Sequence, residues 1–554
     1  RGYGNPNLFL MTISFSSSRN TSQVEENEIY VGLRSIDIIK EPLSIGETFF
    51  IQVNNVPIFA KGANWIPADA FESRVTDSVI EEILQSAYDA NMNTIRNWGG
   101  GIYQHDKFYE ICDQKGLLVW EEFMFACAMY PRDKNFLNTV KEEVKHQVLR
   151  LMKHPSIIIW SGNNENELAL GSGSSTGWYM ETRINPYRYV VDYNYLNTDT
   201  LYNTIHEYDK TRPWLPSSPS NGILETNPYV ERWGNPASPY WGDVHYYNYK
   251  DLCTDISIYP TPRFASEYGF QSYPSFRKMA EISLPEDWKP FSAFMNHRQH
   301  HPRGNEELDL QIRQHFNYPN STNSTKYFSD WLYLTQCVHA LCLRTESEHY
   351  RRLKSQDART MGALYWQLNS IWQAPTWATI EYGNTWKLAH YYTTHFFNTT
   401  IISSYVNKNG IYEVYVTSDS MENQNGEYNI KAIEWYDGSV ASEWKGNITI
   451  NALDSVLIFQ EDIDIMLQAT YNASELVFTL EWIVDEKEIA KNVFYLTTIS
   501  EANLQPTSLT YQINTNTLPY GITVQCSSVS PFTYLETSVK GRFSDNGFLC
   551  NPNQ

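Results

Sequence analysis

Residues 157–167 read Ile-Ile-Ile-Trp-Ser-Gly-Asn-Asn-Glu-Asn-Glu, an apolar run that ends in a dense cluster of polar side chains. A short apolar run followed by turn residues is typical of a strand that is buried on both faces, as in a parallel sheet. Apolar residues recur at helical spacing over 76–90 and 136–152, and both stretches precede this run. The alternation of buried strand and helix predicts an α/β fold.

Strand-like runs of this kind recur between residues 45 and 403, and helical patterns separate many of them. Alternations continued over roughly 350 residues predict a (β/α)8 TIM barrel with insertions. Thr76 is expected to cap the helix over 76–90. The connection from 270 to 360 is long and polar, and we expect it to be an excursion near the barrel mouth. The expected strands are 58–65, 94–98, 117–123, 157–162, 214–217, 243–247, 263–268 and 363–368.

Both ends of the chain lack a helical period. Residues 1–44 contain alternating strands at 8–15 and 28–34, which are too few for a complete β-sandwich. Residues 404–554 predict one or two β-sandwich domains, because short strands alternate with polar turns. The expected fold class is therefore α/β plus all-β, with a catalytic barrel at 45–403. The expected C-terminal strands are 412–417, 428–435, 447–450, 476–482, 492–496, 508–513 and 541–543.

The composition of the chain excludes some partners. Its 554 residues include 42 Lys and Arg against 63 Asp and Glu, a net charge of −21 at pH 7. Nucleic acids and anionic membrane faces bind clustered positive charge, so neither is expected as a partner. No run of 18 apolar residues occurs, so no membrane-spanning helix is expected. Aromatic residues make up 15% of the chain, which suits both large cores and sugar-binding clefts.

Cysteine use and glycosylation sequons favour a secreted or lysosomal protein with N-glycans. The seven Cys are odd in number, and Cys526 with Cys550 is the expected disulfide, because both lie in one β-rich segment. No Cys or His cluster has zinc-site spacing, so no metal is expected. The chain begins at Arg1 rather than Met, and we expect a processed chain or a fragment. Sequons occur at Asn20, Asn320, Asn323, Asn398, Asn447 and Asn472.

Two glutamates lie at the ends of expected barrel strands, where the loops form the mouth. Glu165 follows the strand at 157–162, and Glu267 lies in an otherwise apolar strand. A buried carboxylate is costly without a partner, so Glu267 is either functional or part of an ion pair, for example with Arg96. Facing carboxyl groups about 5–5.5 Å apart suit a retaining glycosidase, and about 6.5–9.5 Å an inverting one. Glu167 is an alternative to Glu165 as the acid.

Several motifs run in order through the expected barrel. They are residues 160–167, the sequence Phe-Ala-Ser-Glu-Tyr-Gly at 264–269, and Arg-Asn-Trp-Gly-Gly-Gly-Ile-Tyr at 96–103. With these motifs the chain resembles glycoside hydrolase family two and, within it, the lysosomal-type β-mannosidases. The resemblance implies that residues 1–44 are part of an immunoglobulin-like sandwich, and that the family's N-terminal jelly-roll domain lies outside this chain. Further matching stretches are 61–69, 242–247 and 362–369.

The resemblance also implies roles for individual residues. Glu165 matches the acid/base and Glu267 the nucleophile, while Arg96 would keep Glu267 ionised. Asn164 matches the asparagine that bonds the sugar 2-hydroxyl. No metal or organic cofactor is implied. Further implied substrate contacts are Trp366 as the floor of the sugar subsite, Trp98 at its rim, and His245, Tyr246, Asn64, Trp65, Asp69 and Glu122.

The function implied is that of a retaining exo-glycosidase that removes terminal β-D-mannose from oligosaccharides of glycoprotein origin. The alternatives are a β-galactosidase or β-glucuronidase of the same family, and an inactive carbohydrate-binding relative or fragment. Glu122 stands where the family has Asp, one methylene shorter. We therefore expect Asp to be tolerated at this position.

Overall fold

The structure, a computed structural model, describes residues 2–18, 20–171, 178–222, 225–226, 229–230, 235–516 and 518–553. The chain forms two units, which are described separately below. The first unit comprises residues 1–246, 261–268 and 358–367, and the second comprises 247–260, 269–357 and 368–554.

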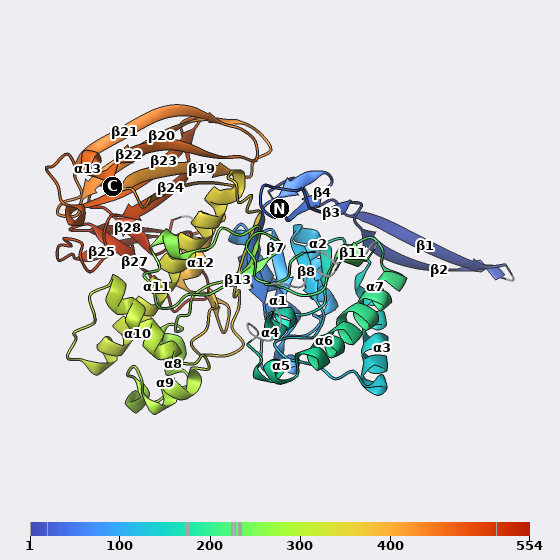
Figure 1. The fold of residues 1–554 in the computed structure, drawn as a ribbon. Coiled ribbons are helices and arrows are strands. Elements are labelled where there is room, and N and C mark those ends of the chain that lie inside the picture. The colour runs from blue at the N-terminus through green and yellow to red at the C-terminus, as the bar shows by residue number, and fades with distance from the viewer. Residues whose placement is uncertain are drawn as a thin grey trace. The chain divides into compact units, whose positions relative to one another are not determined.

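An eight-stranded parallel sheet forms the core of the first unit (Figure 1). The strand order is β10-β9-β8-β7-β6-β15-β14-β13, so the last strand in sequence, β15, pairs with the first, β6. This order confirms the predicted TIM barrel, and each expected strand overlaps an observed one. The strands are β6 (Ala60–Trp65), β7 (Thr94–Asn97), β8 (Leu118–Glu122), β9 (Ile157–Ser161), β10 (Trp214–Leu215), β13 (Val244–Tyr246), β14 (Ala265–Tyr268) and β15 (Gly362–Tyr365).

Hydrogen bonds of Asp243, rather than a described strand ladder, connect the segment after β10 with β13. The Asp243 carboxylate accepts hydrogen bonds from Ser218 Oγ at 2.6 Å and from the Ser220 amide at 2.9 Å. The Asp243 amide donates to the Ser220 carbonyl oxygen at 3.2 Å. Asp243 therefore links the segment after β10 to the start of β13.

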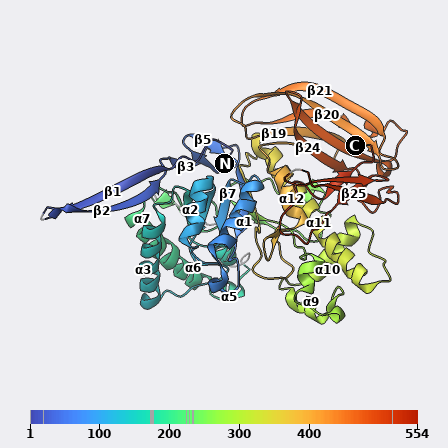
Figure 2. The ribbon, with the colours of Figure 1, turned by 180° about the vertical axis from the view of Figure 1, so that it is seen from behind.

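The helices of this unit lie beside its strands (Figure 2). Thr76 caps α1 as predicted, because its side chain accepts a hydrogen bond from the Val79 amide. Asp133 caps α3 in the same way, through the amides of Asn135 and Phe136. The helices of this unit are η1 (Glu72–Arg74), α1 (Asp77–Asp89), α2 (Asp106–Lys115), α3 (Lys134–Leu151), α4 (Asn166–Leu170), α5 (Met180–Ile184), α6 (Pro186–Asn194), the π-helix η2 (Tyr195–Tyr202) and α7 (Asn203–Tyr208).

The N-terminal segment forms a hairpin followed by a three-stranded antiparallel sheet. Strands β1 (Phe9–Ser17) and β2 (Asn20–Val31) form a long hairpin that projects from the unit (Figure 1). Strand β3 (Ile36–Ile39) instead pairs with β4 (Phe50–Val53), across the expected boundary at residue 44, and β4 pairs with β5 (Val56–Ile58). The apolar side chains of β3 and β4 pack in one core cluster with barrel residues such as Trp120, so residues 36–39 belong with the barrel. A short hairpin joins β11 (Glu225–Thr226) and β12 (Tyr229–Val230).

The second unit combines helices with β-sandwich modules. The disulfide Cys253–Cys342, which the sequence did not indicate, joins residues 247–260 to the long helix α11. Its helices are η3 (Ile256–Ile258), α8 (Phe276–Ala280), η4 (Pro285–Asp287), α9 (Ala293–Arg298), α10 (Gly304–His315), α11 (Ser324–Arg352), η5 (Leu353–Ser355), α12 (Leu388–Phe396), α13 (Ile463–Met466) and η6 (Ala473–Glu475).

Its described strands form a three-stranded sheet, a four-stranded sheet and the two-stranded sheets β16-β17, β25-β26 and β27-β28. The predicted disulfide Cys526–Cys550 is confirmed. The prediction of a strand at 541–543 is wrong, because these residues have no regular secondary structure. The strands are β16 (Ile380–Glu381), β17 (Thr385–Trp386), β18 (Thr400–Val406), β19 (Ile411–Ser418), β20 (Gln424–Glu434), β21 (Val440–Ile450), β22 (Ser455–Asp462), β23 (Leu476–Val484), β24 (Lys487–Tyr495), β25 (Leu509–Asn514), β26 (Gly521–Cys526), β27 (Ser530–Thr533) and β28 (Phe548–Cys550).

Across the described segments, every helix is too short or too polar to cross a lipid bilayer.

A buried carboxyl group lies between the barrel and α2. Glu121 Oε1 accepts hydrogen bonds from Asn97 Nδ2 at 2.9 Å and from the Tyr109 hydroxyl at 3.0 Å. Its Oε2 has no hydrogen-bond partner among the described residues. Burial raises the pKa of Glu121 from 4.5 to about 8, because desolvation outweighs the two hydrogen bonds.

Glu121 should make the folded protein less stable as the pH rises. The folded protein keeps the Glu121 proton up to about pH 8, whereas the unfolded chain releases it near pH 4.5. The contribution is therefore complete below the unfolded pKa and is lost as the pH rises through the folded pKa, at about 1.4 kcal/mol per pH unit. Urea unfolding at pH 5 and pH 8 should show a smaller pH difference for Glu121→Gln than for the unsubstituted chain. Equal differences would contradict the assignment.

Candidate active site

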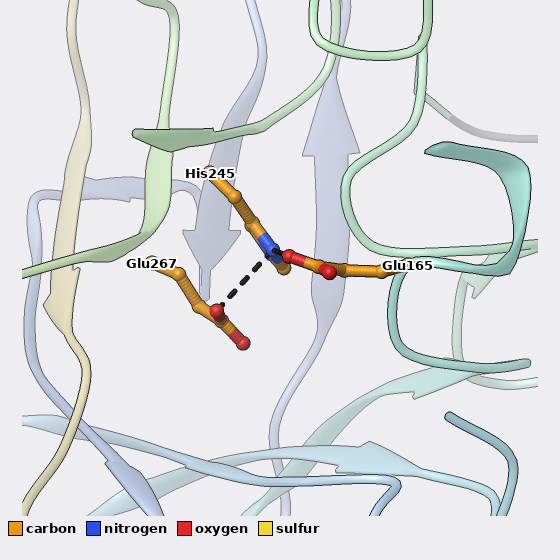
Figure 3. Close-up of side chains that lie close together, drawn as sticks. All are labelled: Glu165, His245 and Glu267. Carbon is orange, nitrogen blue, oxygen red and sulfur yellow. Dashed lines mark hydrogen bonds and ion pairs between the residues drawn. The ribbon is translucent and has the colours of Figure 1, made fainter. Parts of the chain in front are cut away.

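Glu165 and Glu267 lie close together at the carboxyl ends of the barrel strands, with His245 between them (Figure 3). Glu165 follows β9, His245 lies on β13 and Glu267 on β14. One side-chain O or N atom of each residue lies within 4.8 Å of those of the other two. The structure therefore brings together three residues that are far apart in the sequence.

The backbone around Glu165 fixes the position of its side chain. Glu165 has a positive φ of 61° at the start of α4, and its amide donates to the Ser218 carbonyl oxygen at 2.8 Å. The preceding Asn164 is bonded to the segment after β8, through the Phe125 carbonyl and the Cys127 amide. Glu167 is directed elsewhere, since its carboxylate accepts a hydrogen bond from the Tyr193 hydroxyl of α6. This placement favours Glu165 over Glu167 as the acid.

Arg96 of β7 is the centre of a buried hydrogen-bond network. Its Nη1 donates to Glu267 Oε1 and to Asn64 Oδ1, each at 2.5 Å. Its Nη2 donates to Glu122 Oε1 at 2.8 Å and to Asn164 Oδ1 at 2.7 Å. Burial alone would lower the pKa of Arg96, but Glu122 and Glu267 raise it above its ordinary value. Arg96 is therefore a fixed positive charge beside Glu267.

Two amide side chains hold this guanidinium in place. Asn64 Nδ2 donates to the carbonyl oxygens of Ser266, Leu364 and Tyr365, at 3.0–3.2 Å. Asn64 is fully buried and fully bonded, so it orients Arg96 rather than facing a ligand. Asn164 accepts from Arg96 and donates to Cys127 Sγ at 3.3 Å.

Glu122 is bound on both of its oxygens. Oε1 accepts from Arg96 and from Ser161 Oγ, and Oε2 accepts from the Gly99 amide at 2.9 Å. Burial raises the pKa of Glu122 to about 7, although the positive charge of Arg96 opposes this shift. Each of the hydrogen bonds to Glu122 is donated by its partner, and such bonds favour the ionised form. Glu122 therefore supports Arg96 and the loop that begins with Trp98.

Two aromatic side chains lie at the same end of the barrel. Trp98 follows β7 and Trp366 follows β15, and their rings meet edge to face with centroids 5.0 Å apart. Both are half-buried. A half-buried indole pair can present an apolar surface to one face of a sugar ring.

Three other candidates are placed less favourably for ligand contact. Trp65 is fully buried and packs against Phe108 of α2, because strand alternation turns it away from Asn64. Asp69 accepts a hydrogen bond from the Phe71 amide within its own loop. Tyr246 follows His245, so alternation directs it to the other face of β13.

Several residues near the glutamates were not singled out from the sequence. Cys127 Sγ lies 3.8 Å from Glu165 Oε2. Ser218 contacts His245 Nε2 at 3.2 Å, and both Ser218 and Ser266 donate to Asp243 Oδ2. Asp243 and Ser266 lie within the quoted motifs at 242–247 and 264–269, which was the available signal.

Two carboxylates and one imidazole at this spacing also resemble a set of metal ligands. We assign no metal to them, because Arg96 already holds one oxygen of Glu267 and His245 is bonded directly to Glu165. A metal ion would have to break these contacts and bring a second positive charge close to Arg96.

The two glutamates have unlike surroundings. Glu267 is paired with a permanent cation, which favours the ionised carboxylate. Burial raises the pKa of Glu165, although Arg96 opposes the shift, and this favours a protonated carboxyl group. One ionised and one protonated carboxyl group side by side can supply a nucleophile and a general acid.

Family models match three segments of the chain. Residues 46–216 match the TIM barrel domain of glycosyl hydrolases family 2, residues 410–499 a mannosidase Ig/CBM-like domain, and residues 504–554 an Ig-fold domain. The chain is 40% identical to a β-mannosidase of Bos taurus and 39% identical to one of Mus musculus. In each case the alignment covers 99% of this chain and 63% of the relative. The chain thus spans less than two thirds of the length of these relatives.

Solved structures share the fold. A β-D-mannosidase from Dictyoglomus thermophilum superposes with a TM-score of 0.85 at 27% identity, over 100% of this chain and 64% of that one. An exo-chitosanase from Amycolatopsis orientalis superposes with a TM-score of 0.74 at 16% identity, over 100% and 66%. The domain matches, the sequence similarity and the shared fold together show that the chain belongs to glycosyl hydrolases family 2.

Proposed function

We propose that the chain carries the active site of a retaining exo-β-mannosidase. Its substrates would be oligosaccharides of glycoprotein origin that end in β-linked mannose. The observation that carries this proposal is the pairing of Glu165 with Glu267, whose side-chain oxygens approach within 4.8 Å. A bound of 4.8 Å on one pair of oxygens favours a retaining enzyme, whose carboxyl groups lie about 5–5.5 Å apart, over an inverting enzyme, whose groups lie about 6.5–9.5 Å apart.

The proposed reaction has two steps. Glu267 forms a bond to the anomeric carbon while the glycosidic C–O bond breaks, and the departing oxygen takes the proton of Glu165. Glu165 is then ionised, and it takes a proton from the water molecule that attacks the glycosyl ester of Glu267. Arg96 keeps Glu267 ionised for the first step and stabilises it as a leaving group in the second. The sequence of steps needs no cofactor.

The proposed substrate contacts follow from placement. Trp366 and Trp98 would form the floor and rim of the sugar subsite, because they are half-buried at the carboxyl ends of β15 and β7. Asn164 would bond the 2-hydroxyl of the sugar. Asn64 and Glu122 would act indirectly, by positioning Arg96. The mannosidase relatives support mannose over other sugars.

A lysosomal or secreted location fits the two disulfides. Cys253–Cys342 and Cys526–Cys550 are bonds that persist in oxidising compartments. The sequons make N-glycans a further expectation.

A panel of nitrophenyl glycosides tests the activity. We expect turnover of the β-mannoside and little turnover of the α-mannoside, the β-galactoside or the β-glucuronide. The first product observed by NMR should be the β-anomer. Glu267→Gln should lower turnover by several orders of magnitude with the fold retained, whereas Glu167→Gln should stay near the unsubstituted rate. Preferred hydrolysis of another sugar, or an active Glu267→Gln variant, would refute the proposal.

The structure also changes the expectation for Glu122. Asp is one methylene shorter and cannot reach both Arg96 and the Gly99 amide. A shift of about 1 Å in a positioning group can cost about 100-fold in rate. We therefore expect Glu122→Asp to lower kcat about 10- to 100-fold, measured with the nitrophenyl β-mannoside.

Glu72→Asp is a matched control for this variant, because Glu72 pairs with an exposed histidine, His105. It should keep the activity of the unsubstituted chain. Full activity of Glu122→Asp would show that contact with both groups is not required.

A further inference from the structure

The imidazole of His245 makes a separate hydrogen bond through each ring nitrogen. Its Nδ1 lies 2.7 Å from Glu165 Oε1 and 3.3 Å from Glu267 Oε2. Its Nε2 lies 3.2 Å from Ser218 Oγ. The side chain is almost fully buried, so these neighbours determine where its protons reside.

Hydrogen counting on the Nε2 side leads to one arrangement. Asp243 Oδ2 accepts from Ser218 Oγ at 2.6 Å and from Ser266 Oγ at 2.5 Å, and Oδ1 accepts from the Ser220 amide. A serine hydroxyl has one hydrogen, and that of Ser218 is used in its bond to Asp243. Ser218 Oγ also lies 3.3 Å from Ser266 Oγ, whose hydrogen is used in its own bond to Asp243. The bond between Ser218 and His245 must therefore be donated by Nε2–H.

The Nδ1 side then shares a single proton with Glu165. A nitrogen and a carboxyl oxygen 2.7 Å apart need one hydrogen between them, because two lone pairs at this distance repel. The hydrogen resides either on Glu165 Oε1 or on His245 Nδ1. In both cases the pair formed by Glu165 and His245 carries one proton beyond that on Nε2.

The charged groups around His245 indicate which atom holds this proton. Burial lowers the pKa of His245 to about 4, with Arg96 adding to the shift and Glu267 and Asp243 opposing it. Burial raises the pKa of Glu165. Both pKa shifts favour the shared proton on Glu165 Oε1, with His245 Nδ1 as the hydrogen-bond acceptor.

We propose that His245 is a positioning residue that holds the proton of Glu165 in the site. Ser218 and Asp243 fix its Nε2–H form, which leaves the Nδ1 lone pair facing Glu165. This inference rests on the proposed function, in which Glu165 gives that proton to the departing glycosidic oxygen.

The same contact would assist both halves of the reaction. When the C1–O bond breaks and the bond from Glu267 to C1 forms, the shared proton moves to the departing oxygen. The Glu165 carboxylate then faces the Nδ1 lone pair without a hydrogen between them. This repulsion makes Glu165 a stronger base, so it takes a proton from the attacking water and restores the initial state.

Ser218→Ala tests the proposal. Without the serine oxygen, Nε2–H has no acceptor, so the imidazole should change to the Nδ1–H form. The shared proton then resides on Nδ1 and the Nε2 proton is released to solvent, so Nδ1–H donates to an ionised Glu165, which has no proton to give. Asp243→Asn should act in the same direction, because an amide can donate to Ser218 and turn the serine hydrogen toward Nε2. Ser266→Ala is the matched control, since it removes the other hydroxyl from Asp243 Oδ2, and its 3.3 Å contact with Ser218, but leaves the bond between Ser218 and His245 in place.

The measurement is kcat/KM against pH for two substrates, dinitrophenyl β-mannoside and methyl β-mannoside. The dinitrophenolate leaves without a proton, whereas the methoxide needs one. In Ser218→Ala and Asp243→Asn we expect at least a 10-fold greater loss on the methyl glycoside, and a basic limb shifted about one pH unit lower. Ser266→Ala should keep the substrate ratio of the unsubstituted chain. Glu165→Ala gives the limiting case, because its acid is removed altogether. This variant should not hydrolyse the methyl glycoside, and azide should restore its turnover of the dinitrophenyl glycoside.

Equal losses on both substrates with an unmoved basic limb, in both variants, would overturn the proposal and leave His245 a structural role. The same selective loss in Ser266→Ala would also overturn it. A variant that shows no thermal unfolding transition is set aside as unfolded, and the other variant then decides the test. Failure of the proposed function is distinct, since the unsubstituted chain would then turn over neither β-mannoside.

Discussion

The site depends on one buried cation, the guanidinium of Arg96. It lies on β7 and contacts side chains from β6, β8, β14 and the segment after β9, so five parts of the barrel meet at one group. Removing a guanidinium from water costs several kcal/mol unless its hydrogen bonds are replaced. Here two carboxylates and two amide oxygens replace them. The position of Glu267 is therefore fixed by the same contacts that make burial of Arg96 tolerable.

The two glutamates differ in function because they have different partners. Glu267 faces a group that is always charged, whereas Glu165 faces an imidazole that can accept a hydrogen bond. Two identical carboxyl groups this close would otherwise compete for one proton. The arrangement removes that ambiguity, because the cation contacts Glu267 and the imidazole lies closer to Glu165 than to Glu267.

Much of the barrel could be predicted from the sequence, since apolar runs and helical spacing are local signals. The same signals placed Glu165 and Glu267 at strand ends. Strand alternation was also available, and it separates Glu122, which faces Arg96, from Glu121, which faces α2. The contact of His245 with both glutamates was not available, because it depends on the register of β13 against β14. The pairing of residues 36–39 with 50–53 and the bond Cys253–Cys342 are likewise long-range features without a local signal.

The linkage between β10 and β13 connects the fold to the chemistry. Asp243 bridges the two strands where no ladder pair joins them in the described segments, and the same carboxylate holds Ser218 against His245. A ladder of backbone bonds would join the strands equally well, but it would leave the imidazole free to adopt either neutral form. A side-chain bridge can do both, because a carboxylate accepts several hydrogen bonds at once. The irregular part of the barrel is therefore the part that can set the protonation of its histidine.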